Sequence, residues 1–383
     1  MRKPFVFMLV CSFLCLFTAG GALAQGSKEP YKIGAVMSLT GYSSWVGVLS
    51  QKGAQVQAEM INKAGGVNGR PLELIIYDAQ SKPEESSRVT QRLITRDKVV
   101  ALTGAESVPV AAPMVALANQ NKTVVVMGGG YPVNPEKEPY IFNFSHPTDF
   151  AIQRPFLYFK KHNMTKLAFI MPIGSLGELA TKLGKQYAAE YGLTIVGEEK
   201  FEGTVPDVTA QLAKLRALKP DAYVAFASGE PAAMVARNAA QLNIKEPILV
   251  SHGNATLGFL KMVSNLSTFL VLPSGKVSIY EQLPDSDPAK KVLAQFDRRM
   301  RERFNEPGTY YSGQQADGIA LIAEGLRKAG TSDEAKLRDA VENIKGLIGT
   351  NGIFNMTPKD HYGLKLDDMV VITVKGGKWV LLD

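Results

Sequence analysis

Side chains that commonly do chemistry are sparse in this sequence and match no catalytic pattern. The segment Gly174-Ser175-Leu176-Gly177 is one residue short of the G-x-S-x-G turn that carries a nucleophilic serine. The run 128–130 is all glycine but lacks the G-x-G-x-x-G spacing of a phosphate-binding loop. We therefore expect no catalytic residue and no enzyme.

The histidines and cysteines form no metal-binding pattern either. Four histidines lie far apart in the chain, with no H-x-x-x-H pair, at His146, His162, His252 and His361. The two cysteines, Cys11 and Cys15, fall in an N-terminal apolar segment. We expect no metal site and no cofactor.

A binding site is instead expected in loops that follow predicted strands. In open α/β sheets, ligands bind beyond the carboxyl ends of the strands, beside helix N-termini. Six loops have this position, and they contain Trp45, Ser107, Gly129, Tyr131, Leu176, Glu230 and His252. Backbone N–H groups and the helix dipole favour a carboxylate there, and aromatic side chains can cover an apolar part of the ligand.

Most of these residues also have a structural interpretation, which the sequence leaves open. Trp45 can be a core residue, and Ser107 can cap the helix that follows it. Gly129 can serve a tight turn, and His252 can be a buried structural histidine. Glu230 can be a helix N-terminal acid that the dipole favours.

Alternating strand and helix patterns must position these loops. Between residues 33 and 127, short β-rich runs alternate with helical runs, and the alternation restarts at 166 after a change of pattern near 146–149. Such alternation predicts parallel sheets with helical crossovers. The chain is also longer than one hydrophobic core usually organises. We predict an α/β fold of two similar lobes, each a parallel sheet flanked by helices.

The last third of the sequence is expected to complete both lobes rather than to form a third. Three helical patterns are followed by two strand patterns near the C-terminus. We assign residues 31–146 plus 277–349 to lobe 1, and residues 147–276 plus 350–383 to lobe 2.

The N-terminal segment 1–24 has the pattern of a secretory signal peptide. Arg2 and Lys3 precede an apolar run, and Ala22-Leu23-Ala24 fits a cleavage site. We therefore expect cleavage after Ala24 and a periplasmic location. The formal net charge of +7 is scattered rather than gathered in one tract, so we expect no nucleic-acid partner.

Several segments resemble the periplasmic leucine/isoleucine/valine-binding protein family of ABC importers. They include KIGAVMSLTG, GGVNGRPLELIIYD at 65–78, and ALTGAESVPVAAPM, and the resemblance continues through most of the chain. It implies a type I binding-protein fold with a hinge cleft, in which the lobes close on a ligand. It also implies delivery of that ligand to a membrane ABC permease.

The resemblance carries the family's ligand contacts onto both lobes. In lobe 1 they fall at Trp45, Ser107, Gly129 and Tyr131. In lobe 2, Leu176 stands where the family has a tyrosine.

His252 stands where the family has the acid that binds the ligand's ammonium group. A buried ammonium without a carboxylate would cost several kcal/mol. Either Glu106 or Glu230 takes that role, or the ligand is not an α-amino acid. We expect a solute-binding protein for a branched-chain or other hydrophobic amino acid, with an aromatic or aliphatic carboxylate as the alternative. A ligand-sensing receptor domain is the alternative from another class.

Overall fold

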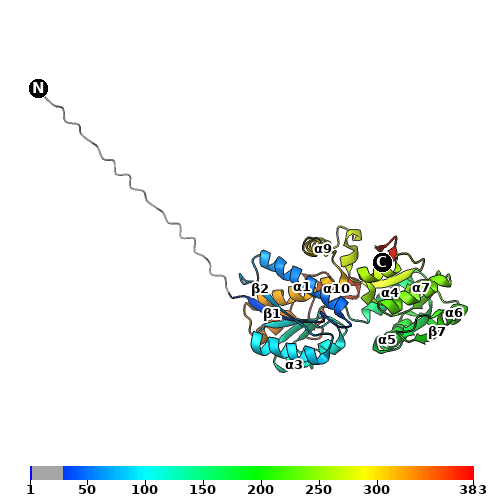
Figure 1. Cartoon of the computed structure of the whole chain (residues 1–383), viewed down its shortest axis with the longest axis horizontal. Coiled ribbons are helices and arrows are strands. Elements are labelled where there is room, and N and C mark those ends of the chain that lie inside the picture. The colour runs from blue at the N-terminus through cyan, green and yellow to red at the C-terminus, as the bar shows by residue number, and fades with distance from the viewer. Residues whose placement is uncertain (2–28) are drawn as a thin grey trace.

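Two helix-flanked sheets form the two lobes (Figure 1). The computed structural model describes residue 1 and residues 29–383. The predicted signal peptide and its cleavage site therefore lie outside the described residues, apart from Met1. Among the residues that are described, no helix is long and apolar enough to cross a membrane.

The first sheet has five parallel strands in the order β2-β1-β3-β4-β5. The strands are β1 (Tyr31–Met37), β2 (Leu72–Asp78), β3 (Ala101–Gly104), β4 (Val124–Met127) and β5 (Ile141–Asn143). The helices that precede β5 are α1 (Ser44–Lys63), α2 (Pro83–Arg92), a π-helical turn (Leu93–Asp97) and α3 (Val108–Gln120). Every residue of β4 is buried, as expected for a parallel strand covered on both faces.

The second sheet has seven strands in the order β14-β13-β10-β9-β8-β6-β7. Its parallel strands are β6 (Lys166–Pro172), β7 (Thr194–Phe201), β8 (Ala222–Val224), β9 (Ile248–Leu249) and β10 (Leu270–Ser274). An antiparallel hairpin, β13 (Val370–Lys375) and β14 (Lys378–Leu381), extends one edge. The predicted fold class is confirmed, and the hairpin is an addition to the parallel part of this sheet.

Helices and short 3-10 turns connect the second sheet. The helices are α4 (Phe150–Lys161), α5 (Ser175–Tyr191), α6 (Thr209–Ala217), α7 (Glu230–Gln241), α8 (Leu257–Val263) and α9 (Lys290–Phe304). The 3-10 turns are η2 (His252–Asn254), η3 (Lys276–Gln282) and η4 (Leu366–Asp368).

The chain passes between the two cores three times. Phe144 packs in the core of the first sheet, and Ala151 packs in that of the second. The chain returns along α10 (Tyr310–Ala329), whose first residue joins the second core while Ile319 joins the first. It crosses again between Leu364 and Met369. Helix α10 therefore runs from one lobe to the other, as Figure 1 shows.

Residues 277–349 and 350–383, the C-terminal segments of the two predicted lobes, each have parts that pack in the first core and parts that pack in the second. Val277 and Leu293 lie in the core beside β10, whereas α11 (Glu334–Glu342) packs in the first core. The short pair β11 (Leu347–Ile348) and β12 (Ile353–Phe354) also packs against the first core. The lobe boundaries stay a prediction. We propose that η3 and α9 belong to lobe 2, and that β12 belongs to lobe 1 together with β11, which was already assigned there.

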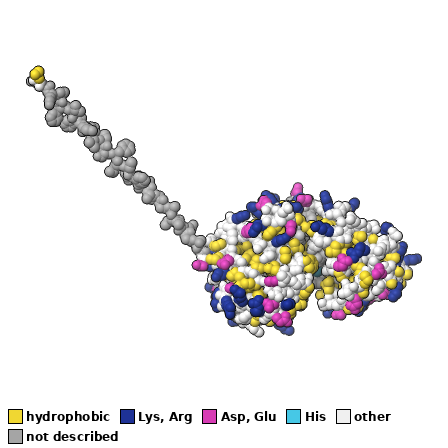
Figure 2. Space-filling model, in the orientation of Figure 1, with side chains coloured by type: hydrophobic (Ala, Val, Ile, Leu, Met, Phe, Trp, Pro, Cys, Tyr) yellow, Lys and Arg dark blue, Asp and Glu magenta, His cyan; other side chains and the backbone are white. Residues whose placement is uncertain are grey.

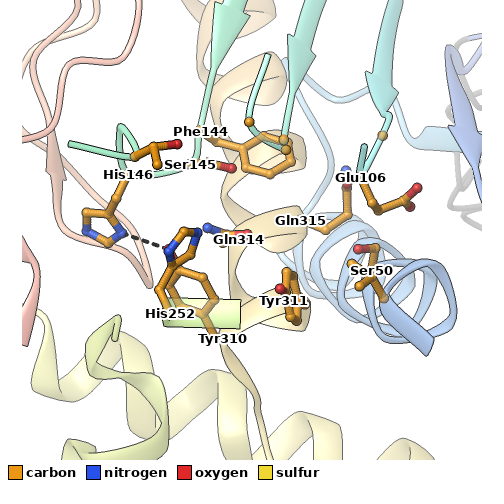
Figure 3. A pocket seen from close by; sticks show the side chains of 16 residues that line it. Ser50, Glu106, Phe144, Ser145, His146, His252, Tyr310, Tyr311, Gln314 and Gln315 are labelled. Carbon is orange, nitrogen blue, oxygen red and sulfur yellow. Dashed lines mark hydrogen bonds between the residues drawn. The ribbon is translucent and has the colours of Figure 1, made fainter. Parts of the chain in front are cut away.

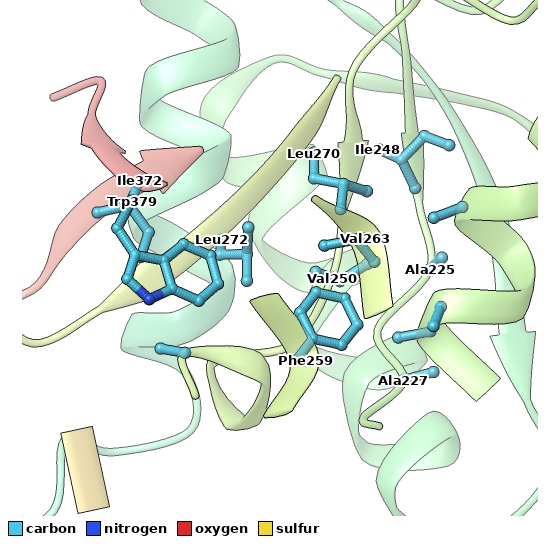
Figure 4. Close-up of a cluster of buried hydrophobic side chains, with 14 of the residues drawn as sticks. Ala225, Ala227, Ile248, Val250, Phe259, Val263, Leu270, Leu272, Ile372 and Trp379 are labelled. Carbon is cyan, nitrogen blue, oxygen red and sulfur yellow. The ribbon is translucent and has the colours of Figure 1, made fainter. Parts of the chain in front are cut away.

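A buried hydrophobic cluster of the second lobe directly precedes the loop that carries His252; Figure 4 shows the cluster. Val250, which directly follows β9, and Leu272, from β10, lie in one buried cluster with Phe259 of α8 and Trp379 of β14. All four side chains are buried. The turn η2 therefore begins next to residues whose side chains are packed in the core.

Charged side chains of both signs are interspersed over both lobes on the face shown, and a hollow separates the lobes (Figure 2). Within α9, Arg299 pairs with Glu302, and Arg301 pairs with Asp297. The first pair lies on the exposed face of the helix, whereas Asp297 is buried.

Candidate ligand-binding site

A cavity of about 110 Å³ lies where loops of both lobes meet the start of α10 (Figure 3). Sixteen described residues line it: Val46, Ser50, Gly104, Glu106, Gly128, Gly129, Gly130, Phe144, Ser145, His146, Thr148, His252, Tyr310, Tyr311, Gln314 and Gln315. One water molecule needs about 10–15 Å³ of cavity volume, so this cavity has room for on the order of ten non-hydrogen atoms. That is the size of a small amino acid or of an acid with one ring.

Glu106 enters the cavity wall from the sharp turn that follows β3. Gly104 has a φ of +108°, and a Cβ there would lie 2.1 Å from the carbonyl oxygen of Val36. Oε2 of Glu106 accepts the backbone N–H of Ser38 at 3.1 Å, while Oε1 is buried with no partner. Burial raises the pKa of Glu106 to about 7, although hydrogen bonds from its own and the Ser38 backbone favour the ionised form.

The glycine run after β4 lies against this turn. Gly129 has a φ of +73°, and a Cβ there would lie 2.9 Å from the carbonyl oxygen of Ala105. Glycine is therefore required for the two loops to lie so close. The N–H groups of Gly129 and Gly130 donate to no residue that the structure describes, so they are available to an acceptor.

The first crossover contributes three polar side chains, those of Ser145, His146 and Thr148. The backbone N–H of Ser145 donates to Oδ1 of Asn143 at 2.7 Å, but the Ser145 hydroxyl has no partner. Nδ1 of His146 lies 3.3 Å from the hydroxyl of Tyr310, and Nε2 is buried without a hydrogen bond. Burial, followed by the nearby His252, lowers the pKa of His146 to about 3, so the imidazole is neutral at neutral pH.

The N-terminus of α10 presents aromatic and amide side chains. A capping box between Thr309 and Ser312 begins the helix and fixes Tyr310 and Tyr311 in its first turn. One turn further, Gln315 donates from Nε2 to the hydroxyl of Thr103 at 2.7 Å, which ties the helix to β3. Burial raises the pKa of both tyrosine hydroxyls, so they remain neutral donors.

His252 reaches the cavity wall from the loop that follows β9 in the second lobe. The side chain of Asn254 holds its turn, because Nδ2 donates to the carbonyl of Ala227 at 2.7 Å and Oδ1 accepts the N–H of Gly229 at 2.7 Å. Nδ1 of His252 is buried and has no partner. Burial lowers the pKa of this imidazole to about 4.

Unpartnered polar atoms concentrate around the cavity. Among the described residues, four of the eleven such buried side-chain atoms border it: Glu106 Oε1, Ser145 Oγ, His146 Nε2 and His252 Nδ1. Buried polar groups are normally hydrogen-bonded, so this cluster indicates a site that a ligand completes. Nowhere in the described chain do three histidine, cysteine or acidic residues come together as metal ligands would.

The structure brings two of the predicted residues, Gly129 and His252, into the cavity wall. Trp45 and Glu230 instead line a neighbouring depression of about 290 Å³. Trp45 is 45% exposed and packs edge-to-face on Tyr311, with ring centroids 5.4 Å apart. The Glu230 side chain is 66% exposed and forms an ion pair with Arg237.

The other three predicted residues line neither the cavity nor the depression. Ser107 precedes α3 without a side-chain capping bond, and its Oγ accepts the hydroxyl of Tyr42 at 3.3 Å. Tyr131 donates to Glu138 at 2.6 Å. Leu176 is exposed near the start of α5.

Sequence reasoning missed several cavity residues, notably Ser145, His146, Tyr310 and Gln314. For Ser145 and His146, the sequence signal was the interruption of the strand–helix alternation near residues 146–149. Nothing local marked Tyr310, because its role depends on α10 crossing between the lobes.

Trp45 is expected to report ligand binding through its fluorescence. Its contact, Tyr311, lines the cavity, so a bound ligand changes the surroundings of the indole. Trp45→Phe should abolish the ligand-dependent change. The matched Trp379→Phe should retain it, because Trp379 is buried against the second-lobe core. A signal that persists in Trp45→Phe would contradict this assignment.

The fold and the cavity define a two-lobed binding protein. The family model described as periplasmic binding protein matches residues 30–378, and the chain belongs to this family.

Relatives with curated names are binding proteins rather than enzymes. A leucine-, isoleucine-, valine-, threonine- and alanine-binding protein of Pseudomonas aeruginosa is 21% identical over 334 residues, which covers 86% of each chain. A Leu/Ile/Val-binding protein homolog of Brucella abortus is 23% identical and covers 94% of this chain and 85% of its own length. The chain is accordingly similar to leucine/isoleucine/valine-binding proteins, as the sequence resemblance predicted.

Solved structures support the same fold. An extracellular ligand-binding receptor from Rhodopseudomonas palustris has a TM-score of 0.81 and 24% identity, and covers 93% of this chain and 100% of its own. The substrate-binding protein LivJ of a branched-chain amino acid transporter from Streptococcus pneumoniae, solved with isoleucine, has a TM-score of 0.76 and 22% identity, covering 91% and 97%. At these identities the likeness concerns the fold alone.

Proposed function

We propose that this protein is the periplasmic solute-binding subunit of an ABC importer, which captures a small amino acid or related carboxylate between its lobes and delivers it to the permease. The cavity carries the proposal, because both lobes line it and four unpartnered buried polar atoms border it. Family membership supports the transport role. The ligand must bind the closed form of the two lobes more tightly than the open form. Equal affinity for both forms would leave the equilibrium between them unchanged.

The hydrogen-bond donors that line the cavity can bind a carboxylate. The N–H groups of Gly129 and Gly130 and the hydroxyl of Tyr310 can each donate to a carboxylate oxygen. No lysine or arginine is among the lining residues, so the carboxylate is held by hydrogen bonds from neutral donors.

Glu106 is the acid best placed to bind an ammonium group. It borders the cavity, and its Oε1 has no partner. Glu230, by contrast, is exposed and already paired with Arg237. We propose that the ammonium of an amino acid faces Glu106, in the first lobe.

A thermal-shift screen tests this function. The protein would be heated with leucine, isoleucine, valine and phenylalanine, with their deaminated analogues, and with benzoate. A ligand at 100 times its dissociation constant adds about 2.7 kcal/mol to the free energy of unfolding, which is readily measured. Stabilisation by none of these compounds would contradict the proposal.

A carboxylate without an amino group is the second candidate ligand. His252 favours it, because lobe 2 supplies this neutral donor and no acid to the cavity. Deaminated acids would then stabilise the protein more than the amino acids do, with Glu106 protonated beside them.

A further inference from the structure

The cavity wall is polar over most of its extent. Apart from glycines, Val46 and Phe144 are the only lining residues in the described chain whose side chains lack a polar atom. Pockets that take aliphatic groups are lined mainly by hydrophobic side chains. The branched-chain ligand expected from the sequence therefore matches this lining poorly.

Polar groups lie at two separate ends of the cavity (Figure 3). Glu106 lies beside Ser50 at one end, against α1. His146 and His252 lie together at the other end, and Gln314 lies between the two ends. A ligand that satisfies only the Glu106 end leaves the histidine end without partners.

The histidine end has hydrogen-bonding capacity that the protein itself does not use. No described residue forms a hydrogen bond with the imidazole of His252, and its Nδ1 is buried. The nearby Ser145 hydroxyl is buried and unpartnered as well. A neutral imidazole has one donor and one acceptor nitrogen, so it can pair with a hydroxyl, an amide or a carboxylate.

We propose that the ligand is polar at both ends, with one group held at the Glu106 end and a second hydrogen-bonding group meeting His252 and Ser145. This inference rests on the proposed function and narrows its ligand class. The second group separates the true ligand from an aliphatic amino acid of the same shape, because the aliphatic analogue leaves buried polar atoms unpaired.

Pairs of compounds that differ mainly in one polar group test the inference. Calorimetry would compare valine with threonine, leucine with asparagine, phenylalanine with tyrosine, and benzoate with 4-hydroxybenzoate. We expect the polar member of at least one pair to bind about 10-fold or more tightly than its partner. Apolar members that bind as well as or better than polar ones in every pair would overturn the inference and leave the proposed function standing. Binding by no compound at all would overturn the proposed function too.

A substitution at His252 tests the assignment of the second group. His252→Phe keeps a ring of similar size and removes both nitrogens. We expect the preference for the polar member to fall by about 10-fold while affinity for the apolar member is retained. The matched control is His162→Phe, at an exposed histidine that follows α4, which should leave both affinities unchanged. An unchanged preference in folded His252→Phe would overturn the assignment, as would an equal loss of both affinities.

Discussion

Replacing Glu106 with glutamine is expected to weaken amino-acid binding about 100-fold while the protein stays folded. Glutamine keeps the volume and an oxygen that can accept the N–H of Ser38, which now lies 3.1 Å from Oε2. It removes the charge that pairs with the ammonium group. Truncating one partner of a buried charge pair costs about 2–5 kcal/mol, which is roughly 30- to 4,000-fold in the dissociation constant. Calorimetric titration of both proteins measures the difference.

The same carboxylate predicts a pH dependence of binding. Burial raises the pKa of Glu106 to about 7 in the free protein, and an ammonium beside it would lower that pKa. Binding an amino acid then releases a proton below pH 7, so affinity should rise with pH, by up to tenfold per unit, and level off above about 7. His146 and His252 stay neutral between pH 5 and 8, because burial lowers their pKa values to about 3 and 4. Asp78, whose charge opposes ionisation of Glu106, has a lowered pKa and is ionised throughout.

The matched control is Glu230→Gln. This acid is exposed and paired with Arg237, so its substitution should leave both the affinity and its pH dependence unchanged. Glu106→Gln should in turn make the affinity for amino acids independent of pH between 5 and 8. A large loss in Glu230→Gln with none in Glu106→Gln would reverse the assignment. A deaminated ligand should show the opposite pH dependence in the wild type, since its carboxylate binds best when Glu106 is protonated.

The elements of this fold were predictable because their signals are local. Proline is favoured at the first position of a helix, and α2 begins at Pro83. The buried run at β4 was visible as consecutive β-branched residues. Strand β10 was not predicted, because Pro273 interrupts its apolar run.

The site was less predictable because its walls come from distant parts of the chain. The expectation that ligands bind beyond strand ends named Gly129 and His252, and both lie in loops that line the cavity. It could not foresee that the Tyr131 hydroxyl would bond Glu138 only seven residues away, a local partner that holds it outside. Nor could it place His146 beside Tyr310, since that contact depends on two crossovers between the lobes.

Helices α1 and α10 must pack at backbone distance to form two walls of the cavity. Val46 and Ser50 line it from α1, and Gln314 and Gln315 line it from α10. At Gly53, a Cβ atom would lie 1.9 Å from the carbonyl oxygen of Ser312. Because that neighbour is backbone, no rotamer change can relieve the overlap.

Gly53→Ala should therefore destabilise the protein and weaken ligand binding together. Overpacking commonly costs about 1–3 kcal/mol, and a backbone clash belongs at or above the upper end. We expect the melting temperature to fall by roughly 5–10 °C. Ligand affinity should fall at least tenfold, because separating the helices moves both walls. The control is Gly258→Ala in α8, where the added Cβ meets nothing closer than 3.9 Å and stability should be unchanged or slightly raised. Wild-type stability in Gly53→Ala would mean that the two helices do not pack at this distance in solution.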